Sequence, residues 1–188
     1  DVDGAIADAH LSCIPTHNTD VAISGAAAVA GAIAMALKPN SSLQDLVDAG
    51  IYAGEQGRKY GHVWLGASVP ARIRLAVEIA RKDTPVRQRL QELYDVIGAT
   101  LAISEAVPAA FGVLVMAEGD PVRAGVLAAA LSGDADTVAA MACAMAGAWK
   151  GISAFKPEYL SLMQAANPWL DFEGITAGLY ALAAKKVS

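Results

Sequence analysis

The amino-acid sequence predicts an all-α fold, and three observations support this prediction. Hydrophobic residues make up 55% of the 188 residues, and alanine, the strongest helix former, is the most frequent of them. Apolar side chains recur at the spacing of a helix face, most clearly at Leu90, Leu93, Tyr94 and Ile97. No segment alternates with the period of two that a half-buried strand requires. Because small side chains let helix axes approach closely, we expect tightly packed helices.

Three helices are expected in the first third of the chain, each delimited by residues that start or stop a helix. Pro15 ends the helix over residues 2–13, because proline cannot continue a helix. The alanine-rich helix over residues 20–37 stops before Pro39, and a capping-box pattern opens the helix over residues 42–57.

The middle of the chain is less regular. Residues 58–68 show no helical period and are expected to form a loop. Pro70 can occupy the first turn of a helix over residues 70–81, and the apolar stripe described above predicts a helix over residues 86–97. Five further helices are expected at residues 105–117, 120–131, 136–150, 157–166 and 172–186.

The helices over residues 20–37 and 138–150 are expected to be the buried central helices. Both are rich in alanine and carry no charge between their ends. Each is shorter than the roughly 20 residues that span a bilayer. We therefore expect core helices and no membrane association. The chain shows no repeat, low-complexity segment or linker, so residues 1–188 are expected to form one domain.

Charge and cysteine content limit the expected partners and compartment. The net charge is −5, and an acidic chain repels phosphate backbones, so nucleic-acid binding is not expected. Cys13 and Cys143 lie in apolar helical sequence without metal-ligand spacing. They are expected to be buried free thiols in a reducing compartment. Together with the acidic start at Asp1, which does not resemble a signal peptide, this predicts a cytoplasmic protein.

Residues 132–137 hold the strongest candidate for a functional site. Asp134, Asp136 and Thr137 lie at a predicted turn that enters a helix, where three side chains can point at one spot. Hard cations such as Mg²⁺, Mn²⁺ and Ca²⁺ prefer such oxygen ligands. Gly133 lets the backbone approach a ligand, and the free N–H groups of the helix start can bind an anion beside the cation.

A plain helix cap is the alternative for this segment, because Asp is a favoured N-cap residue and acids suit the first turn of a helix. The sequence that follows favours a metal. Residues 138–151 predict a buried helix of small residues, which would place Asp134 and Asp136 at its inner end. Acidic groups at a buried end require a partner cation.

A second candidate lies in the loop before the helix over residues 20–37, where His17 follows Thr16. A histidine between polar residues can bind a ligand, and a surface or helix-capping histidine is the alternative. His10 and His62 lack metal-ligand spacing and receive no role. The sequence contains no serine-hydrolase elbow, phosphate-binding loop or zinc motif, and no catalytic residue is assigned.

Two signatures in this sequence resemble those of the ADP-ribosylglycohydrolase family, in the same order. The first is the Thr16–His17 pair before an alanine-rich helix. The second is the family's Gly-Gly-Asp-x-Asp-Thr, followed by an apolar helix that ends in Gly-Ala-x-x-Gly. Residues 132–137 and 147–151 match this second signature, and residues 107–110 also fit. The similarity covers most of the chain.

The resemblance implies a compact orthogonal bundle of helices around a two-metal site, usually Mg²⁺ with Mn²⁺ as an alternative. Family members hydrolyse the glycosidic bond of ADP-ribose, so the expected partners are ADP-ribosylated protein or a small ADP-ribosyl compound. Asp134, Asp136 and Thr137 match the family's C-terminal metal ligands. The residues that match its substrate-binding cleft are Thr16, His17, Ser132 and Gly133.

The chain departs from the family pattern in two respects. Ser132 stands where the family prefers glycine, which adds bulk near the phosphates. The Gly-Asp motif and the Thr-Asp-Asp cluster of the family's N-terminal half have no match, and Thr19 and Asp20 do not replace them. We therefore expect a C-terminal portion of the family domain that carries half of the metal site. Either the chain is a fragment of a longer protein, or a separate N-terminal segment in another chain completes the site.

Two other functions remain open. A non-catalytic structural or binding protein, like some eye-lens crystallins of this family, would keep the fold without turnover. A plain helical partner module would need no metal. The retained Asp134, Asp136 and Thr137 favour the hydrolase.

Overall fold

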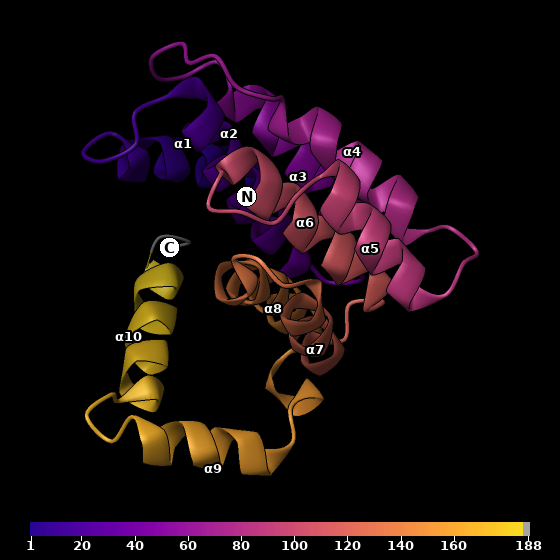
Figure 1. Cartoon of the computed structure of the whole chain (residues 1–188). Helices are drawn as coiled ribbons and strands as arrows, with labels where there is room; N and C mark the ends of the chain where they lie inside the picture. Colours follow the sequence, from indigo (N-terminus) through magenta and orange to yellow (C-terminus); the bar gives the residue numbers. More distant parts are fainter. Residues whose placement is uncertain (186–188) are drawn as a thin grey trace. The chain divides into compact units, whose positions relative to one another are not determined.

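The computed structural model describes residues 1–185 and confirms the all-α prediction. Within these residues there is no β-strand, and one isolated bridge pairs Thr19 with His62. The helices are α1 (Val2–Cys13), α2 (Asp20–Ala36), α3 (Leu43–Gly57), α4 (Val69–Ala80), α5 (Val86–Val96), α6 (Ile103–Met116), α7 (Pro121–Leu131), α8 (Ala135–Lys150), the short 3₁₀ helix η1 (Ile152–Ala154), α9 (Pro157–Ala166) and α10 (Phe172–Lys185) (Figure 1). The last helix was expected to reach Lys186, which lies outside the described residues.

Helix α6 forms the centre of the first of two compact units, residues 1–154. Residues 106–116 are all buried. The helix tolerates an internal proline, because the carbonyl that Pro108 leaves without its helical donor finds another one. Arg72 Nη1 donates to Ser104 O at 2.9 Å. A side chain from α4 therefore replaces the missing backbone hydrogen bond.

Helices α2 and α3 lie side by side and pack unusually closely (Figure 1). Ser24 Oγ donates to Gly54 O at 2.8 Å. A Cβ atom added to Gly57 would lie 2.7 Å from Ala27 Cβ and 3.0 Å from Ile23 O. Glycine is therefore required at position 57, and the small residues of these helices bring their axes together.

Helices α2 and α8, expected to be the buried central helices, are each buried on one face only. The buried residues of α8 are Val138, Ala142, Met145 and Ala146. The more completely buried helix is α6, whose residues 106–116 are all buried. Five helices pack against α6, but five also pack against α2. An apolar composition predicts that a helix can be buried, but it does not say which of its faces are covered.

The second unit comprises residues 155–188, of which residues 155–185 are described. Its helices α9 and α10 contain no buried residue. Local hydrogen bonds define them. Asp171 Oδ1 accepts from Gly174 N at 2.8 Å at the start of α10, and Gln164 Nε2 donates to Leu170 O at 3.0 Å.

The cysteines are unpaired, as expected, but both are only half-buried. Partial burial raises the pKa of the Cys13 and Cys143 thiols, and Cys143 Sγ donates to Pro121 O at 3.3 Å. Among the described residues, no helix has the length and apolar character needed to cross a membrane.

Candidate functional site

A tight turn between α7 and α8 positions the candidate metal ligands. Ser132 has φ 70° and ψ −167°, and Gly133 has φ 70°. Asp134 N–H donates to Ala99 O at 2.6 Å, and a Cβ atom on Gly133 would lie 3.0 Å from the Ala99 carbonyl carbon. Glycine at position 133 is thus a steric requirement. Ser132 occupies a backbone region that is favourable only for glycine.

The side chains of Asp134, Asp136 and Thr137 lie together at the start of α8. Thr137 Oγ1 donates to Asp134 Oδ1 at 2.9 Å. A hydrogen bond with the Asp134 carboxyl, and then the backbone N–H groups of Thr137 and Asp136, hold the pKa of Asp136 below its ordinary value. Asp136 is therefore ionised at neutral pH. Asp134 is the N-cap residue, yet its side chain makes no capping hydrogen bond.

The two aspartates do not lie at a buried end of α8, so that expectation is wrong for the described residues. Asp136 and Thr137 are exposed and Asp134 is half-buried. The turn lies at the surface because α8 is buried on one face only. The first buried residue of that face is Val138, which follows the turn. Burial therefore does not force a cation into this position. The arrangement of the ligands must support it instead.

The three side chains offer the oxygen donors that Mg²⁺ and Mn²⁺ prefer. Two carboxylates and one hydroxyl fall short of the roughly six oxygens that surround Mg²⁺. Within residues 1–185, no group of three or more His, Cys, Asp and Glu side chains could hold a metal ion. This turn can therefore supply part of a metal site, with the other ligands coming from water, substrate or another part of the protein.

His17 lies in the loop between α1 and α2, and both it and Thr16 are exposed. The backbone of the loop is fixed, since His17 N–H donates to Cys13 O and Thr19 N–H donates to His17 O, each at 2.8 Å. Thr19, not His17, caps α2, because Thr19 Oγ1 accepts from Ala22 N at 3.3 Å. His17 therefore does not cap α2. Its exposure fits the alternative of a surface histidine, and its role in binding substrate stays a prediction.

Asp20 is a buried carboxylate that sequence reasoning missed. Its Oδ1 accepts from Val21 N at 2.8 Å and from Trp64 N at 2.9 Å, and its Oδ2 lies 3.7 Å from Arg58 Nε. Asp20 thus ties the irregular loop over residues 58–68 to the start of α2, beside the His17 loop. Only the acid at the helix start was visible in the sequence, whereas its partners come from the far end of α3 and beyond.

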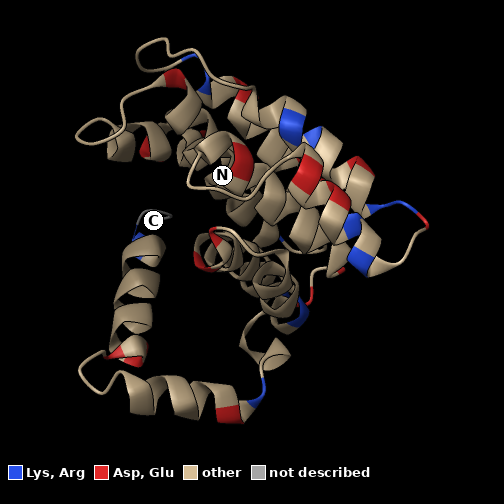
Figure 2. Ribbon diagram, viewed as in Figure 1, with Lys and Arg blue, Asp and Glu red and all other residues tan. Residues whose placement is uncertain are grey.

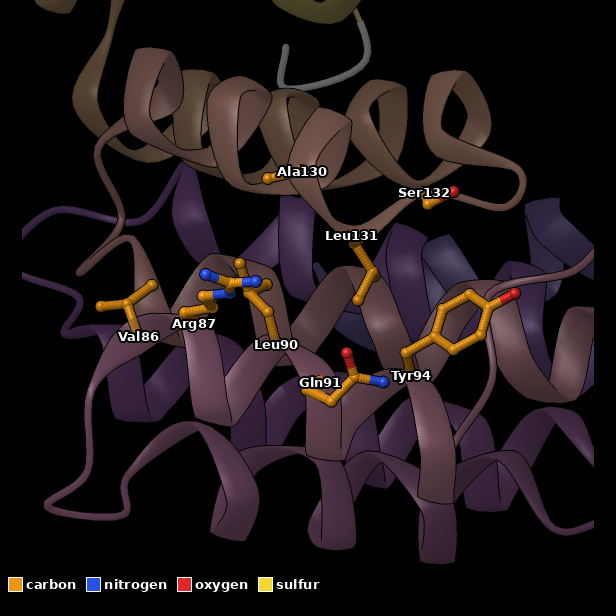
Figure 3. A pocket seen from close by; sticks show the side chains of 8 residues that line it. All are labelled: Val86, Arg87, Leu90, Gln91, Tyr94, Ala130, Leu131 and Ser132. Carbon is orange, nitrogen blue, oxygen red and sulfur yellow. The ribbon is translucent and has the colours of Figure 1, made fainter.

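A groove of about 600 Å³ opens between α5 and α7 and borders the turn. In Figure 3, Tyr94 of α5 lies below Ser132, whereas Arg87 and Gln91 lie further along α5, below Ala130 and Leu131. Ser132 belongs to both the groove and the turn, whereas Asp134, Asp136 and Thr137 are not among the residues that line the groove. The sequence gives no sign of this groove, because it forms between helices that are distant along the chain.

Comparison with known proteins identifies the family of the chain. The family model described as ADP-ribosylglycohydrolase matches residues 1–187. "Uncharacterized protein YegU" of Escherichia coli (strain K12) is 35% identical over 179 residues, which cover 95% of this chain and 53% of that protein. The chain therefore spans about half the length of this curated relative. It belongs to the ADP-ribosylglycohydrolase family, whose name describes hydrolases of glycosidic bonds.

Proposed function

We propose that this chain supplies half of the active site of a metal-dependent hydrolase. The enzyme would cleave the glycosidic bond of ADP-ribosylated protein or of a related ADP-ribosyl or nucleoside compound. Membership of the family supports hydrolysis of a glycosidic bond. Because the chain covers 53% of its relative, we assign the activity to the assembly of both halves of the family fold, not to this half alone.

The observation that carries the proposal is the convergence of Asp134, Asp136 and Thr137. The Thr137–Asp134 hydrogen bond supports this convergence, and so does the hydrogen bond with Asp134 that is the main cause of the lowered pKa of Asp136. These residues would hold Mg²⁺, or Mn²⁺ as an alternative, in a two-metal site. Since Asp136 is already ionised near neutral pH, it need not lose a proton when the metal binds.

The substrate would be held beside these ligands. We assign this role to Thr16 and His17 in the α1–α2 loop and to Ser132 and Gly133 in the turn. The first N–H groups of α8 point toward this end of the helix and favour an anionic group such as a phosphate. Ser132 also borders the groove along α5, which gives the substrate room next to the turn.

The chemistry assigned to the metals is polarisation of a sugar hydroxyl and a lowered pKa of bound water. In this chain, Asp134, Asp136 and Thr137 contribute the ligands, and Gly133 keeps their backbone against Ala99. None of the described residues is assigned as the general base. We assign that role to a carboxylate in the other half of the fold.

A titration of the ¹⁵N-labelled chain with Mn²⁺ tests the metal site. We expect paramagnetic broadening of the amide signals of residues 133–138 at lower Mn²⁺ concentration than elsewhere. Asp136→Asn preserves the shape of the side chain and removes a negative ligand, so Mn²⁺ affinity should fall by about tenfold or more. Asp45→Asn is the matched control, because Asp45 accepts from Ser42 Oγ at 2.7 Å in a similar hydroxyl–carboxylate pair at the start of α3.

Equal Mn²⁺ affinities for the wild type and Asp136→Asn would overturn the metal site. A separate assay addresses catalysis. The 188-residue chain alone should not hydrolyse an ADP-ribosylated peptide, whereas its complex with the other half of the fold should do so in the presence of Mg²⁺. A complex that binds the metal but shows no turnover would instead identify a non-catalytic member of the family.

A further inference from the structure

One face of α2 is apolar and only partly covered by the other helices. After Asp20 the helix carries no charged residue. One side of it packs in the core, but Ala26, Val29, Ala30 and Ile33 are only half-buried. Helices that are apolar on every side are normally enclosed by other elements. The described residues therefore leave this face of α2 with room for a further apolar contact.

Helix α8 shows the same feature. Its charged residues lie near its two ends, at Asp136 and Lys150. Most of the α8 ribbon carries neither charge colour in Figure 2. Between them, Ala140 and Ala144 are exposed and Met141 is half-buried. Alanine at these positions makes a flat helix surface that a second helix can approach closely.

An apolar groove joins these two faces. It has a volume of about 380 Å³ and lies between α2, α6 and α8. Its walls include Val29 and Ile33 of α2, Ile103 and Val107 of α6, and Met141 of α8. The residues that line it are all apolar, so it offers no partner for a charged ligand. Small residues on α2 leave room for the backbone of a packed helix.

The length of the relative points to a candidate occupant of this groove. The 179 matched residues make up only 53% of YegU, so nearly half of that protein has no counterpart in this chain. We propose that the α2–α6–α8 groove seats an apolar helix from that other half of the family fold. The groove is where the two halves dock, and the buried aliphatic side chains provide the main driving force.

The position of the groove links docking to the candidate site. Thr137 and Met141 are four residues apart on α8 and therefore lie on the same helix face. A helix seated against Met141 would therefore lie about one helical turn from Thr137, and the segment next to it could carry the remaining ligands. This last step rests on the proposed function, whereas the docking itself does not.

Co-expression tests the docking. The tagged 188-residue chain is produced together with the part of E. coli YegU that lies outside the matched stretch, and the two should co-purify. Ala26→Arg places a charge in the apolar groove at a half-buried position, so binding should weaken by about tenfold or more. Ala129→Arg, at an exposed position of α7, is the matched control and should bind like the wild type.

Methyl NMR spectra of the labelled chain then locate the contact. Signals of Val29, Ile33, Ile103, Val107 and Met141 should shift on binding. No co-purification, or shifts confined to other methyl groups, would overturn the proposal. Two other results would also overturn it. Shifts of the groove methyl signals that depend on the concentration of the chain alone would identify a second copy as the occupant. Contacts of these methyl groups with another part of the same chain would show that the groove is already filled. Circular dichroism checks that both variants fold. Failure of Mn²⁺ binding with intact co-purification would refute the proposed function and leave the docking surface standing.

Discussion

Helices α6 and α10 are both 14 residues long and largely apolar, yet they lie at opposite extremes of burial. In α6, residues 106–116 are all buried, whereas α10 has no buried residue. Isolated helices of this length are marginal in water. The comparison shows that the local sequence can define where a helix forms. The stability of that helix depends on packing against other helices, which the local sequence does not reveal.

The two helices also differ in how their apolar residues are arranged. Helix α6 is apolar around its whole circumference beyond Glu105. In α10, Phe172, Ile175, Leu179 and Leu182 follow a three–four–three spacing that gathers them on one stripe. Leu179 and Leu182 are 63% and 62% exposed. The α10 pattern is therefore that of a helix built to pack on one side.

The largest expected effect is at the centre of the packed region. Leu114→Ala removes a side chain of α6 that has no exposed surface, and the enclosed site cannot collapse freely around the cavity. We expect a loss of about 2–5 kcal/mol in the free energy of unfolding, measured by urea denaturation followed by circular dichroism. A loss below about 1 kcal/mol would mean that α6 is not the centre of the core, and it would contradict the contrast in packing between α6 and α10.

Much of the fold could be predicted because helix boundaries are set by local chemistry. The predicted capping box at the start of α3 is present, since Ser42 N donates to Asp45 Oδ2 at 2.7 Å and Asp45 N donates to Ser42 Oγ at 3.2 Å. The start of α6 was placed two residues late, at Glu105 rather than Ile103, because Ala102 at its N-cap offers no side-chain hydrogen bond.

What could not be predicted depends on contacts between distant residues. In the sequence, Asp20 has the pattern of an ordinary acidic residue in the first turn of a helix. The Trp64 N–H that donates to its carboxylate is 44 residues away. The surface position of Asp134 and Asp136 was missed because the sequence shows that α8 is apolar but not which of its faces is covered. The close spacing of the three candidate ligands, by contrast, is local and was visible in residues 132–137.

A smaller effect is expected at a residue whose conformation is imposed by the fold against its own preference. Ser132 adopts φ 70° and ψ −167°, which costs a non-glycine residue about 1–3 kcal/mol. Ser132→Gly should relieve this strain. After the greater entropy of glycine in the unfolded chain is subtracted, we expect a gain of about 0.5–2 kcal/mol in the free energy of unfolding.

Ser132→Ala serves as the control for this prediction, because it removes the hydroxyl and keeps the Cβ atom that causes the strain. Its stability should stay within about 0.5 kcal/mol of the wild type. Equal stabilities for the glycine and alanine variants, measured by the same urea denaturation, would contradict the strain explanation.

The smallest effect on stability is expected in α10. Leu179→Ala makes the same chemical change as Leu114→Ala, but at a side chain that is 63% exposed. No cavity forms at such a site, and little apolar surface returns to water on unfolding. We expect a change within about 0.5 kcal/mol in the free energy of unfolding of the chain. The pair of variants thus measures packing alone, with residue type and helix length held constant. If Leu179→Ala instead cost as much as Leu114→Ala, the stripe on α10 would be buried in solution, and a partner for that helix, in a second copy or elsewhere in the chain, would have to exist in the purified protein.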